Sequence, residues 1–182
     1  MGDDELQTTV ELAQKRDPGA LSALYEAYFD RIYRYILVRV RNVTEAEDLA
    51  GQVFLKMVER IDSFKWPEAG GGFSAWLFRI AHNLIVDWSR GSNRTTQLLD
   101  QDLAGGRTPE ETVARDESVR EVLLAMNCLK DDQRQVVLLR LVGGLSSRET
   151  ADVMGTTEGN VRVLQHRALS KIKEQLRVVA NV

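Results

Sequence analysis

The side chains best suited to chemistry in this 182-residue chain cluster near its C-terminal end, between residues 156 and 177. Five basic and only two acidic residues fall there, although the whole chain carries a formal net charge of −3. Basic side chains on a helix hold phosphate oxygens and donate hydrogen bonds to base edges. The segment therefore predicts a nucleic-acid contact, and the acidic whole predicts that the chain alone binds DNA weakly.

Two helices are expected to position these side chains. A capping box formed by Ser146 and Glu149 begins a short helix that ends at Met154. Gly155 supplies the positive φ of a tight turn, and Thr157 begins a longer second helix. This spacing is typical of a helix-turn-helix, whose second helix enters the major groove of DNA by its N-terminal half. Packing of two ordinary helices is the alternative interpretation.

Outward positions on the second helix give the candidate DNA contacts. Arg162 suits a bidentate pair with a guanine edge, whereas Arg167 and Lys171 suit phosphate oxygens. A solvated basic face is the alternative for each basic residue taken alone. The predicted contact set is Asn160, Arg162, Val163, His166, Arg167 and Lys171.

The remainder of the chain also has helical patterning and lacks the alternation typical of strands. Asp17 followed by Pro18 predicts the start of one helix, and a capping box of Thr44 and Glu47 predicts the start of the next. The stretch 62–73, with one proline and three glycines, is expected to be a loop. Helices are expected over 18–40, 44–61, 74–90, 108–127, 131–143, 146–154 and 157–178.

A polar, glycine-containing stretch at 91–107 separates two helical halves. It has no clear hydrophobic period, which is typical of a linker. We therefore predict an all-α fold of two helical domains joined by a flexible linker. The expected bounds are 1–92 for the first domain, 93–112 for the linker and 113–182 for the second domain.

The segment 73–94 mixes aromatic side chains with basic and amide ones. Bases of single-stranded nucleic acid stack on aromatic rings while arginines hold the phosphates. Burial in the core is the favoured interpretation for Trp76, Phe78 and Trp88, because large aromatic side chains dominate core burial. The polar candidates of this segment are Arg79, Asn83, Arg90 and Arg94.

Three motifs in one order give the chain a family resemblance. They are AEDLAGQVF at 46–54, FSAWLFRIAHNLIVDW at 73–88 and LSSRETADVMGTTEGNVRVLQHRAL at 145–169. Together they resemble a core-binding helix, a promoter-melting helix and a helix-turn-helix of the extracytoplasmic-function (ECF, group 4) sigma factors, which belong to the sigma-70 family. The resemblance covers about residues 8–178, and three ordered motifs are more specific than one helix-turn-helix.

The resemblance implies a first domain, sigma region 2, that binds core RNA polymerase at the clamp helices of its β′ subunit and reads the −10 promoter element. The second domain, sigma region 4, would read the −35 element through the contact set given above. The loop 62–73 would accept a flipped −10 base, with Gly70 to Gly72 at its pocket. The implied polymerase-binding residues are Glu47, Asp48, Leu49, Gln52, Val53 and Phe54. The implied −10 residues are Lys65, Trp66, Trp76, Arg79, Asn83 and Arg90.

Two positions depart from the family pattern. Gly51-Gln52 stands where members usually have Gln-Glu, and Leu164-Gln165 stands where many have a basic residue followed by leucine. A glycine inside a helix costs about 1 kcal/mol relative to alanine. The first change also removes a carboxylate from the implied polymerase contact, and the second removes one expected phosphate contact.

Composition narrows the remaining possibilities. No apolar run approaches the roughly 20 residues that span a bilayer, and the acidic N-terminus lacks an apolar signal core. We therefore expect a cytoplasmic protein without membrane insertion. A single cysteine, Cys128, and two distant histidines predict neither an intrachain disulfide nor a metal site. No nucleotide-binding loop or nucleophile–base set favours an enzyme, and no cofactor is expected.

The resemblance further implies three partners for a monomeric chain, namely core RNA polymerase, promoter DNA and an inhibitory anti-sigma factor. The competing hypothesis is a stand-alone helix-turn-helix transcriptional regulator with a sensing or dimerising N-terminal domain. Such a regulator would bind a palindrome as a dimer and would not need polymerase.

Overall fold

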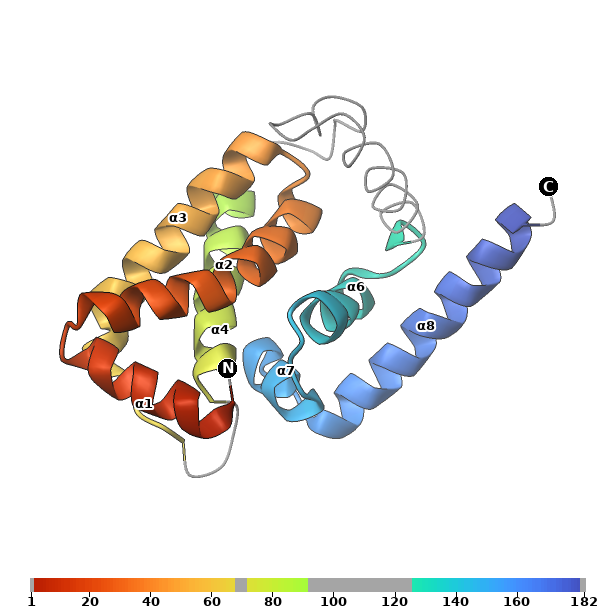
Figure 1. The fold of residues 1–182 in the computed structure, drawn as a ribbon. Helices are drawn as coiled ribbons and strands as arrows, with labels where there is room; N and C mark the ends of the chain where they lie inside the picture. The colour runs from red at the N-terminus through yellow and green to blue at the C-terminus, as the bar shows by residue number, and fades with distance from the viewer. Residues whose placement is uncertain (1, 68–71, 92–125, 181–182) are drawn as a thin grey trace.

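The computed structural model describes residues 2–67, 72–91 and 126–180 of the chain (Figure 1). Every regular element in these ranges is a helix. The elements are α1 (Asp3–Gln14), α2 (Pro18–Val40), α3 (Val43–Arg60), the 3-10 turn η1 (Ile61–Ser63), α4 (Phe73–Gly91), α6 (Asp131–Val137), the π-helical turn η2 (Leu138–Val142), α7 (Ser147–Met154) and α8 (Glu158–Ala180). The predicted all-α architecture of two helical domains is confirmed.

The start of α2 follows the prediction, whereas the start of α3 does not. Asp17 Oδ1 accepts a hydrogen bond from the Ala20 N–H at 2.8 Å. Asn42, rather than Thr44, is the residue that caps α3, since its Oδ1 accepts from the Glu45 N–H at 2.9 Å. Arg41 has a positive φ of 55° that ends α2, so the extended Asn42 is already placed to begin α3. The predicted Thr44–Glu47 capping box is therefore wrong, and α3 is capped two residues earlier than predicted.

Helices α2, α3 and α4 form the core of the first domain. Their inward faces supply fully buried side chains such as Ile32, Met57 and Phe73. Helix α1, which the sequence analysis did not assign, covers this core with Val10. The Gln14 amide at the end of α1 donates to the carbonyls of Ile61 and Phe64, at 3.0 and 2.7 Å. These bonds fasten α1 to the segment that follows α3.

The second domain contains the predicted helix-turn-helix. Ser146 Oγ accepts from the Glu149 N–H at 3.1 Å, and Glu149 Oε2 accepts from the Ser146 N–H at 2.7 Å. Gly155 ends α7 with a φ of +63°, and Thr157 Oγ1 accepts from the Asn160 N–H at 3.2 Å to begin α8. The predicted capping box, turn and second cap are all confirmed. A small core of Val136, Ala151, Val161 and Leu164 joins α6, α7 and α8.

The helix expected over 131–143 is two elements instead of one. Its cap is Lys130, not an aspartate, and α6 ends at Val137. The chain continues as the π-helical turn η2, where the Gly143 N–H donates to the Leu138 carbonyl at 2.8 Å. The helix expected over 108–127, all but its last two residues, and the predicted linker 93–112 lie outside the described residues.

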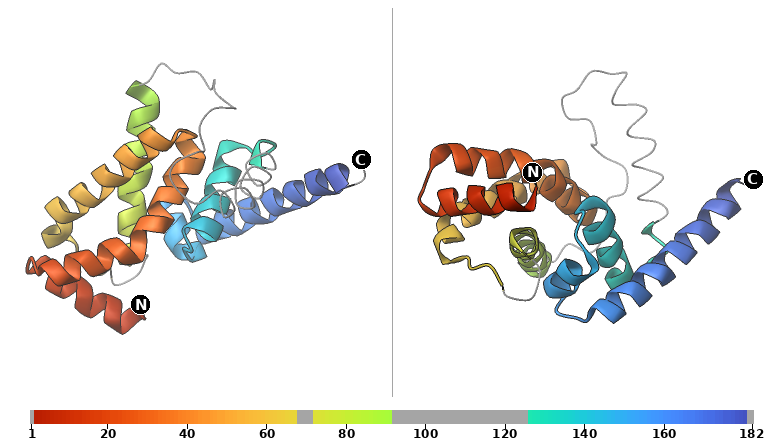
Figure 2. Two further views of the ribbon diagram at one scale, coloured as in Figure 1. Left: turned by 45° about the horizontal axis from the view of Figure 1, so that its top comes forward. Right: turned by 60° about the horizontal axis from the view of Figure 1, so that its bottom comes forward.

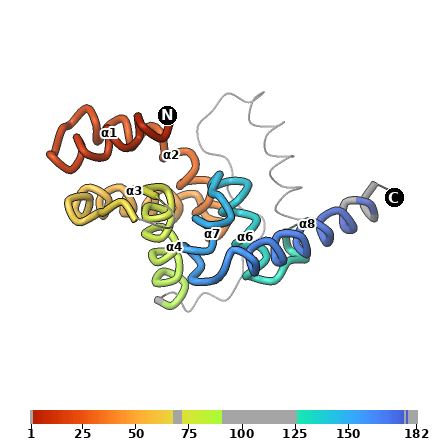
Figure 3. The backbone as a smooth tube through the Cα atoms, turned by 90° about the horizontal axis from the view of Figure 1, so that it is seen from below, coloured from red at the N-terminus to blue at the C-terminus, as the bar shows by residue number. Residues whose placement is uncertain are grey.

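The two domains pack against each other rather than standing apart. Helix α4 lies against α7, as Figure 3 shows, and α2 contacts η2. Leu139, Leu145 and Val153 of the second domain belong to the same buried cluster as the core of the first. The C-terminal part of α8 extends away from the other helices (Figure 2).

Two glycines provide a matched test of backbone conformation. A Cβ added at Gly51 or at Gly155 meets no atom within 4 Å, but only Gly155 has a positive φ. We expect Gly51→Ala to raise the free energy of unfolding by up to about 1 kcal/mol, because alanine favours a helix interior. Gly155→Ala should lower it by about 1 kcal/mol, because an L-residue is strained there. Urea denaturation of both variants checks this, and equal effects would contradict it.

Candidate nucleic-acid interface

The exposed face of α8 carries the predicted −35 contact set. Asn160, Arg162, Val163, His166 and Arg167 are exposed, and Lys171 is half-buried. Val161, Leu164 and Ala168 face inward and fix the rotation of the helix. The predicted contact face is therefore presented to solvent by a helix whose opposite face is packed.

Neighbouring side chains hold two members of this face in place. Arg162 Nη2 lies 2.9 Å from Glu158 Oε2, one turn earlier on α8. This exposed pair contributes little to stability, but it orients the guanidinium along the helix. Asn160 Nδ2 donates to Thr156 Oγ1 at 3.0 Å, so the amide is tied to the turn that precedes α8.

The departure from the family pattern at Leu164-Gln165 has a structural counterpart. Leu164 is buried against α6 and α7. Gln165 Oε1 accepts a hydrogen bond from Arg140 Nε at 3.2 Å, which connects α8 to η2. Gln165 therefore supports the position of α8 from the side of η2.

An aromatic cluster lies where the segment after η1 meets the start of α4. Phe64 is at its centre, with ring centroids 5.2 Å from Trp66 and 5.3 Å from Trp76. Trp66 is 37% exposed, Trp76 is half-buried, and Lys65 beside them is exposed. An exposed indole that is packed on other aromatic rings suits the stacking of an unpaired nucleobase.

The loop ahead of α4 approaches this cluster closely. A Cβ added at Gly72 would lie 3.1 Å from Trp66 Cζ3, so a side chain here would press on the indole. Gly70 and Gly71, the other members of the predicted base pocket, lie outside the described residues. The pocket itself stays a prediction.

Three polar −10 candidates lie along α4. Arg79, Asn83 and Arg90 are exposed, and their spacing of four and seven residues places them on one side of the helix. Arg79 Nη2 donates to the Asp152 carbonyl of α7 at 2.8 Å, so the second domain already engages this guanidinium.

The aromatic side chains of α4 have structural roles. Phe78 is fully buried, which agrees with the core interpretation. Trp88 packs at the edge of the core, and its Nε1 donates to Glu45 Oε2 on α3 at 2.8 Å. This bond anchors the second half of α4 to the first turn of α3.

The implied polymerase-binding residues divide into two groups on α3. Glu47, Asp48 and Gln52 are exposed. Leu49, Val53 and Phe54 are at most 6% exposed. The six residues therefore do not share one exposed face: the three apolar residues pack inward and position the helix, and the polymerase contact stays a prediction.

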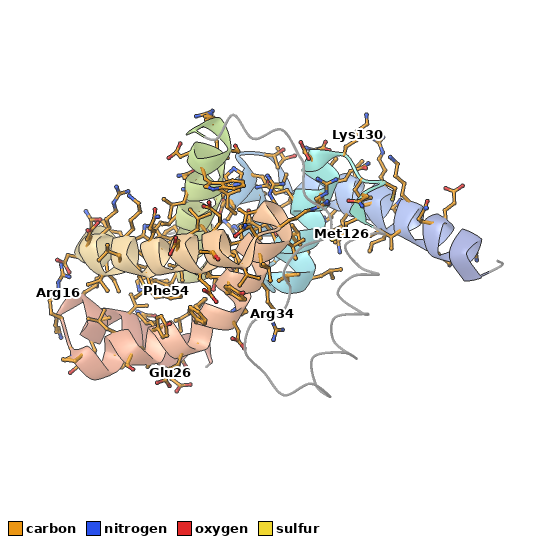
Figure 4. The ribbon with its side chains drawn as sticks, turned by 90° about the horizontal axis from the view of Figure 1, so that it is seen from above. Arg16, Glu26, Arg34, Phe54, Met126 and Lys130 are labelled. Carbon is orange, nitrogen blue, oxygen red and sulfur yellow. The ribbon has the colours of Figure 1, made fainter. Side chains whose placement is uncertain are left out.

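Phe54 illustrates the inward group. It lies between α2 and α3 (Figure 4), with its ring centroid 4.8 Å from Tyr25 and 6.0 Å from Phe29. Sequence reasoning also missed Leu55, which is 60% exposed on the same helix. It follows Asp48 by seven residues and so shares its face. That spacing is the signal by which it could have been found.

Two family matches cover most of the chain. Sigma-70 region 2 matches residues 24–95, and Sigma-70 region 4 matches residues 119–172. The ECF RNA polymerase sigma factor SigD of Mycobacterium tuberculosis is 30% identical over 184 residues, which cover 97% of this chain and 86% of SigD. This chain belongs to the ECF sigma factors.

Other comparisons agree with that membership. The ECF sigma factor BldN of Streptomyces coelicolor is 38% identical over 172 residues, and the chain spans 64% of BldN's length. The solved structure of CnrH in complex with the cytosolic domain of CnrY has a TM-score of 0.72 at 23% identity, covering 94% of this chain and 96% of CnrH. RpoE of Bartonella quintana, in complex with the anti-sigma factor NepR, has a TM-score of 0.64 at 21% identity, covering 86% and 96%. These two structures share the fold.

Membership decides between the two hypotheses raised by the sequence. The chain matches both Sigma-70 region 2 and Sigma-70 region 4. These two matches favour the sigma-factor hypothesis over the stand-alone helix-turn-helix regulator. Within residues 2–67, 72–91 and 126–180, no helix has the length and apolar character needed to cross a membrane.

His82 of this sigma factor lies between its two regions. Its Nδ1 is 2.6 Å from Gln135 Nε2 on α6 and 3.5 Å from the Tyr35 hydroxyl on α2. Burial raises the pKa of Tyr35 to about 12, so its hydroxyl keeps its proton. Because both neighbours present hydrogens, Nδ1 acts as an acceptor and the ring is neutral. Burial, and then the positive charge of Arg39, lower the pKa of His82.

A pH dependence follows from this lowered pKa. As pH falls through about 6.5, the unfolded chain takes up a proton on His82 before the folded chain does. The free energy of unfolding should therefore fall as the solution is acidified from about pH 7.5 to about pH 5.5. His82→Gln should flatten this dependence in urea denaturation. An unchanged slope in His82→Gln would contradict the assignment.

Proposed function

We propose that this ECF sigma factor binds core RNA polymerase through α3 and directs initiation at promoters with −10 and −35 elements read by α4 and α8. The observation that carries the proposal is that each of two domains exposes polar and basic side chains along one helix, α4 or α8, while α3 exposes Glu47, Asp48, Gln52 and Leu55. We assign it to group 4 of the family because its three motifs are confined to regions 2 and 4. The proposed regions are 1–92 and 113–182, joined by the linker 93–112.

The proposed chemistry is recognition rather than catalysis. Arg162 reads a guanine edge of the −35 element, and Arg167 and Lys171 hold phosphates beside it. On α4, Asn83 and Arg90 contact the −10 strand, while Trp66 stacks an unpaired base. Polymerase supplies most of the electrostatic grip on DNA, which an acidic chain cannot supply alone.

An anti-sigma factor is a proposed further partner. CnrH and the RpoE of Bartonella quintana share this fold, and their structures contain the cytosolic domain of CnrY and the anti-sigma factor NepR, respectively. We propose that the present chain is a monomer of the cytoplasm that is held inactive by a protein of this kind.

Run-off transcription tests the function directly. Purified core polymerase should initiate at new sites in a pool of genomic promoters only when the chain is added. These sites should share one pair of −35 and −10 sequences. Binding of duplex DNA as a dimer, with no engagement of core polymerase, would sink the proposal.

Leu55 is the sharpest test of the polymerase contact. Leu55→Ser should weaken binding to core polymerase by about ten- to hundredfold, because an exposed leucine that becomes buried in an interface is worth roughly 1.5–3 kcal/mol. Its effect on the free energy of unfolding should stay within about 0.5 kcal/mol, as for other exposed positions. Leu12→Ser on α1, where the leucine is 43% exposed, is the matched control and should leave core binding unchanged. Equal affinities for the two variants would remove Leu55 from the contact.

Arg162 and Lys171 should differ in how they affect DNA recognition. Arg162→Ala should lower promoter binding by holoenzyme by about 1–3 kcal/mol and relax the preference at one −35 base pair. Lys171→Ala should weaken binding similarly on all promoters and reduce its salt dependence. Filter binding to a promoter and to its single-base variants at several salt concentrations checks this. A uniform loss for Arg162→Ala would show that it contacts phosphate instead.

A further inference from the structure

Helix α1 lies outside the match to Sigma-70 region 2, which begins at residue 24, and the proposed function gives it no role. Its last residue, Gln14, is half-buried beside the segment that leaves α3. The Gln14 amide donates to two backbone carbonyls, that of Ile61 at 3.0 Å and that of Phe64 at 2.7 Å. One side chain of α1 therefore holds both ends of the turn η1.

The segment between α3 and α4 needs such support because it has little regular structure of its own. The turn η1 ends at Ser63, and Phe64 is already extended, with a φ of −67° and a ψ of 132°. Ile61 is fully buried and Phe64 is 6% exposed. A buried carbonyl without a donor is costly, and Gln14 supplies the donor for both residues. The amide thereby fixes the direction in which the chain leaves η1.

The turn that follows α1 adds a second tie to the same segment. Arg16 lies between this turn and the end of α3 (Figure 4). Its Nη1 donates to the Val58 carbonyl in the last turn of α3 at 2.6 Å, and its Nη2 lies 2.5 Å from Asp62 Oδ2 in η1. The ion pair is exposed and contributes little to stability. Its effect is on geometry, because it fixes η1 relative to α1.

The supported segment carries the aromatic cluster that is proposed to stack an unpaired base. The Phe64 ring centroid lies 5.5 Å from that of Phe73, in addition to its contacts with Trp66 and Trp76. Only Lys65 separates the Phe64 carbonyl, which Gln14 holds, from Trp66. A binding side chain must be held within about 0.5 Å of its productive position by the contacts behind it. For Trp66 these contacts lead through Phe64 to Gln14.

We propose that Gln14 is a positioning residue, which holds Phe64 so that Trp66 is preorganised to stack an unpaired −10 base. Arg16 assists by fixing η1. Helix α1 thereby acts on the reading of the −10 strand through the aromatic cluster and not through a DNA contact of its own. The role in reading DNA rests on the proposed function, whereas the effect on Trp66 does not.

Fluorine NMR of the full chain, labelled with 5-fluorotryptophan, tests the effect on Trp66 without polymerase or DNA. The chain has three tryptophans, and each resonance is assigned by replacing one tryptophan with phenylalanine. Gln14→Met keeps the length of the side chain and removes both donors, so the Trp66 resonance should shift or broaden. The Trp88 resonance should stay in place, because Trp88 is bonded to Glu45 on another part of α3. A change in stability alone would not move one native resonance selectively.

Two further variants make this result interpretable. Gln7→Met is the matched control, since Gln7 is exposed on α1 and donates to Glu11 of the same helix at 3.1 Å. It should leave all three resonances unchanged. Arg16→Asn suits the positive φ of 64° at this exposed position, and it should move the Trp66 resonance even if Gln14→Met fails to fold. An unmoved Trp66 resonance in Gln14→Met, or in Arg16→Asn where Gln14→Met does not fold, would overturn the positioning role.

Binding of a single-stranded oligonucleotide by holoenzyme tests the role in reading DNA. The oligonucleotide carries the −10 element of a responsive promoter found by run-off transcription. Gln14→Met should lower its affinity by roughly three- to tenfold, because two hydrogen bonds behind the stacking site are lost. Gln7→Met should leave this affinity unchanged. Binding to core polymerase, and to duplex DNA that carries the −35 element alone, should be the same for both variants.

The outcomes separate the two parts of the proposal from the proposed function. Unchanged affinity for the oligonucleotide, together with a moved Trp66 resonance, would overturn the role in reading DNA and leave the positioning of Trp66 intact. Holoenzyme formed with the unchanged chain should prefer the −10 oligonucleotide to one of scrambled sequence. Without that preference, the proposed −10 function fails, and the role of Gln14 in reading DNA fails with it.

Discussion

The burial of Phe78 is the interaction on which the arrangement of both sigma regions depends. Its ring is fully buried, 5.5 Å from the ring of Tyr35 in α2, and a Cβ added at Gly143, after η2, would lie 3.0 Å from its Cε1. Burying a large aromatic side chain is among the strongest single contributions to a core. By fixing the inward face of α4, Phe78 also fixes which residues of α4 face outward, namely Arg79, Asn83 and Arg90.

Local signals in the sequence predicted much of the fold. The caps at Asp17, Ser146 and Thr157 and the turn at Gly155 were predictable because each depends on a few adjacent residues. The start of α3 was not predictable in this way. Asn42 and Thr44 are both suitable N-cap residues, and the left-handed conformation of Arg41, just before Asn42, selects Asn42. The π-helical turn η2 was missed for a related reason, since nothing in its sequence departs from an ordinary helix.

The candidate interface was predictable in its helices and less so in its individual residues. A resemblance carries the position of a helix but not its rotation, so Leu49, Val53 and Phe54 were grouped with residues that face solvent. The pattern of buried and exposed side chains shows how α3 is rotated, and it identifies Leu55 as an exposed apolar residue on its outer face. The packing of the two regions also could not be predicted, because it depends on contacts between residues more than 100 positions apart, such as Arg31 and Gly143.

The negative net charge of the chain is consistent with a protein that binds DNA together with a larger partner. Basic residues are concentrated on α8, where they act at short range within a Debye length of about 8–10 Å. The remaining acidic surface opposes non-specific association with DNA. Such a chain gains specificity from its side chains and affinity from a larger, basic assembly.

The most direct test of this account is a hydroxyl-radical footprint on a responsive promoter, with and without core polymerase. The account predicts two protected patches, one at the −35 element and one at the −10 element, which form only with core polymerase present. Arg162→Ala should weaken the upstream patch more than the downstream one. A single symmetric patch formed by the chain alone would contradict the account and identify a dimeric regulator instead.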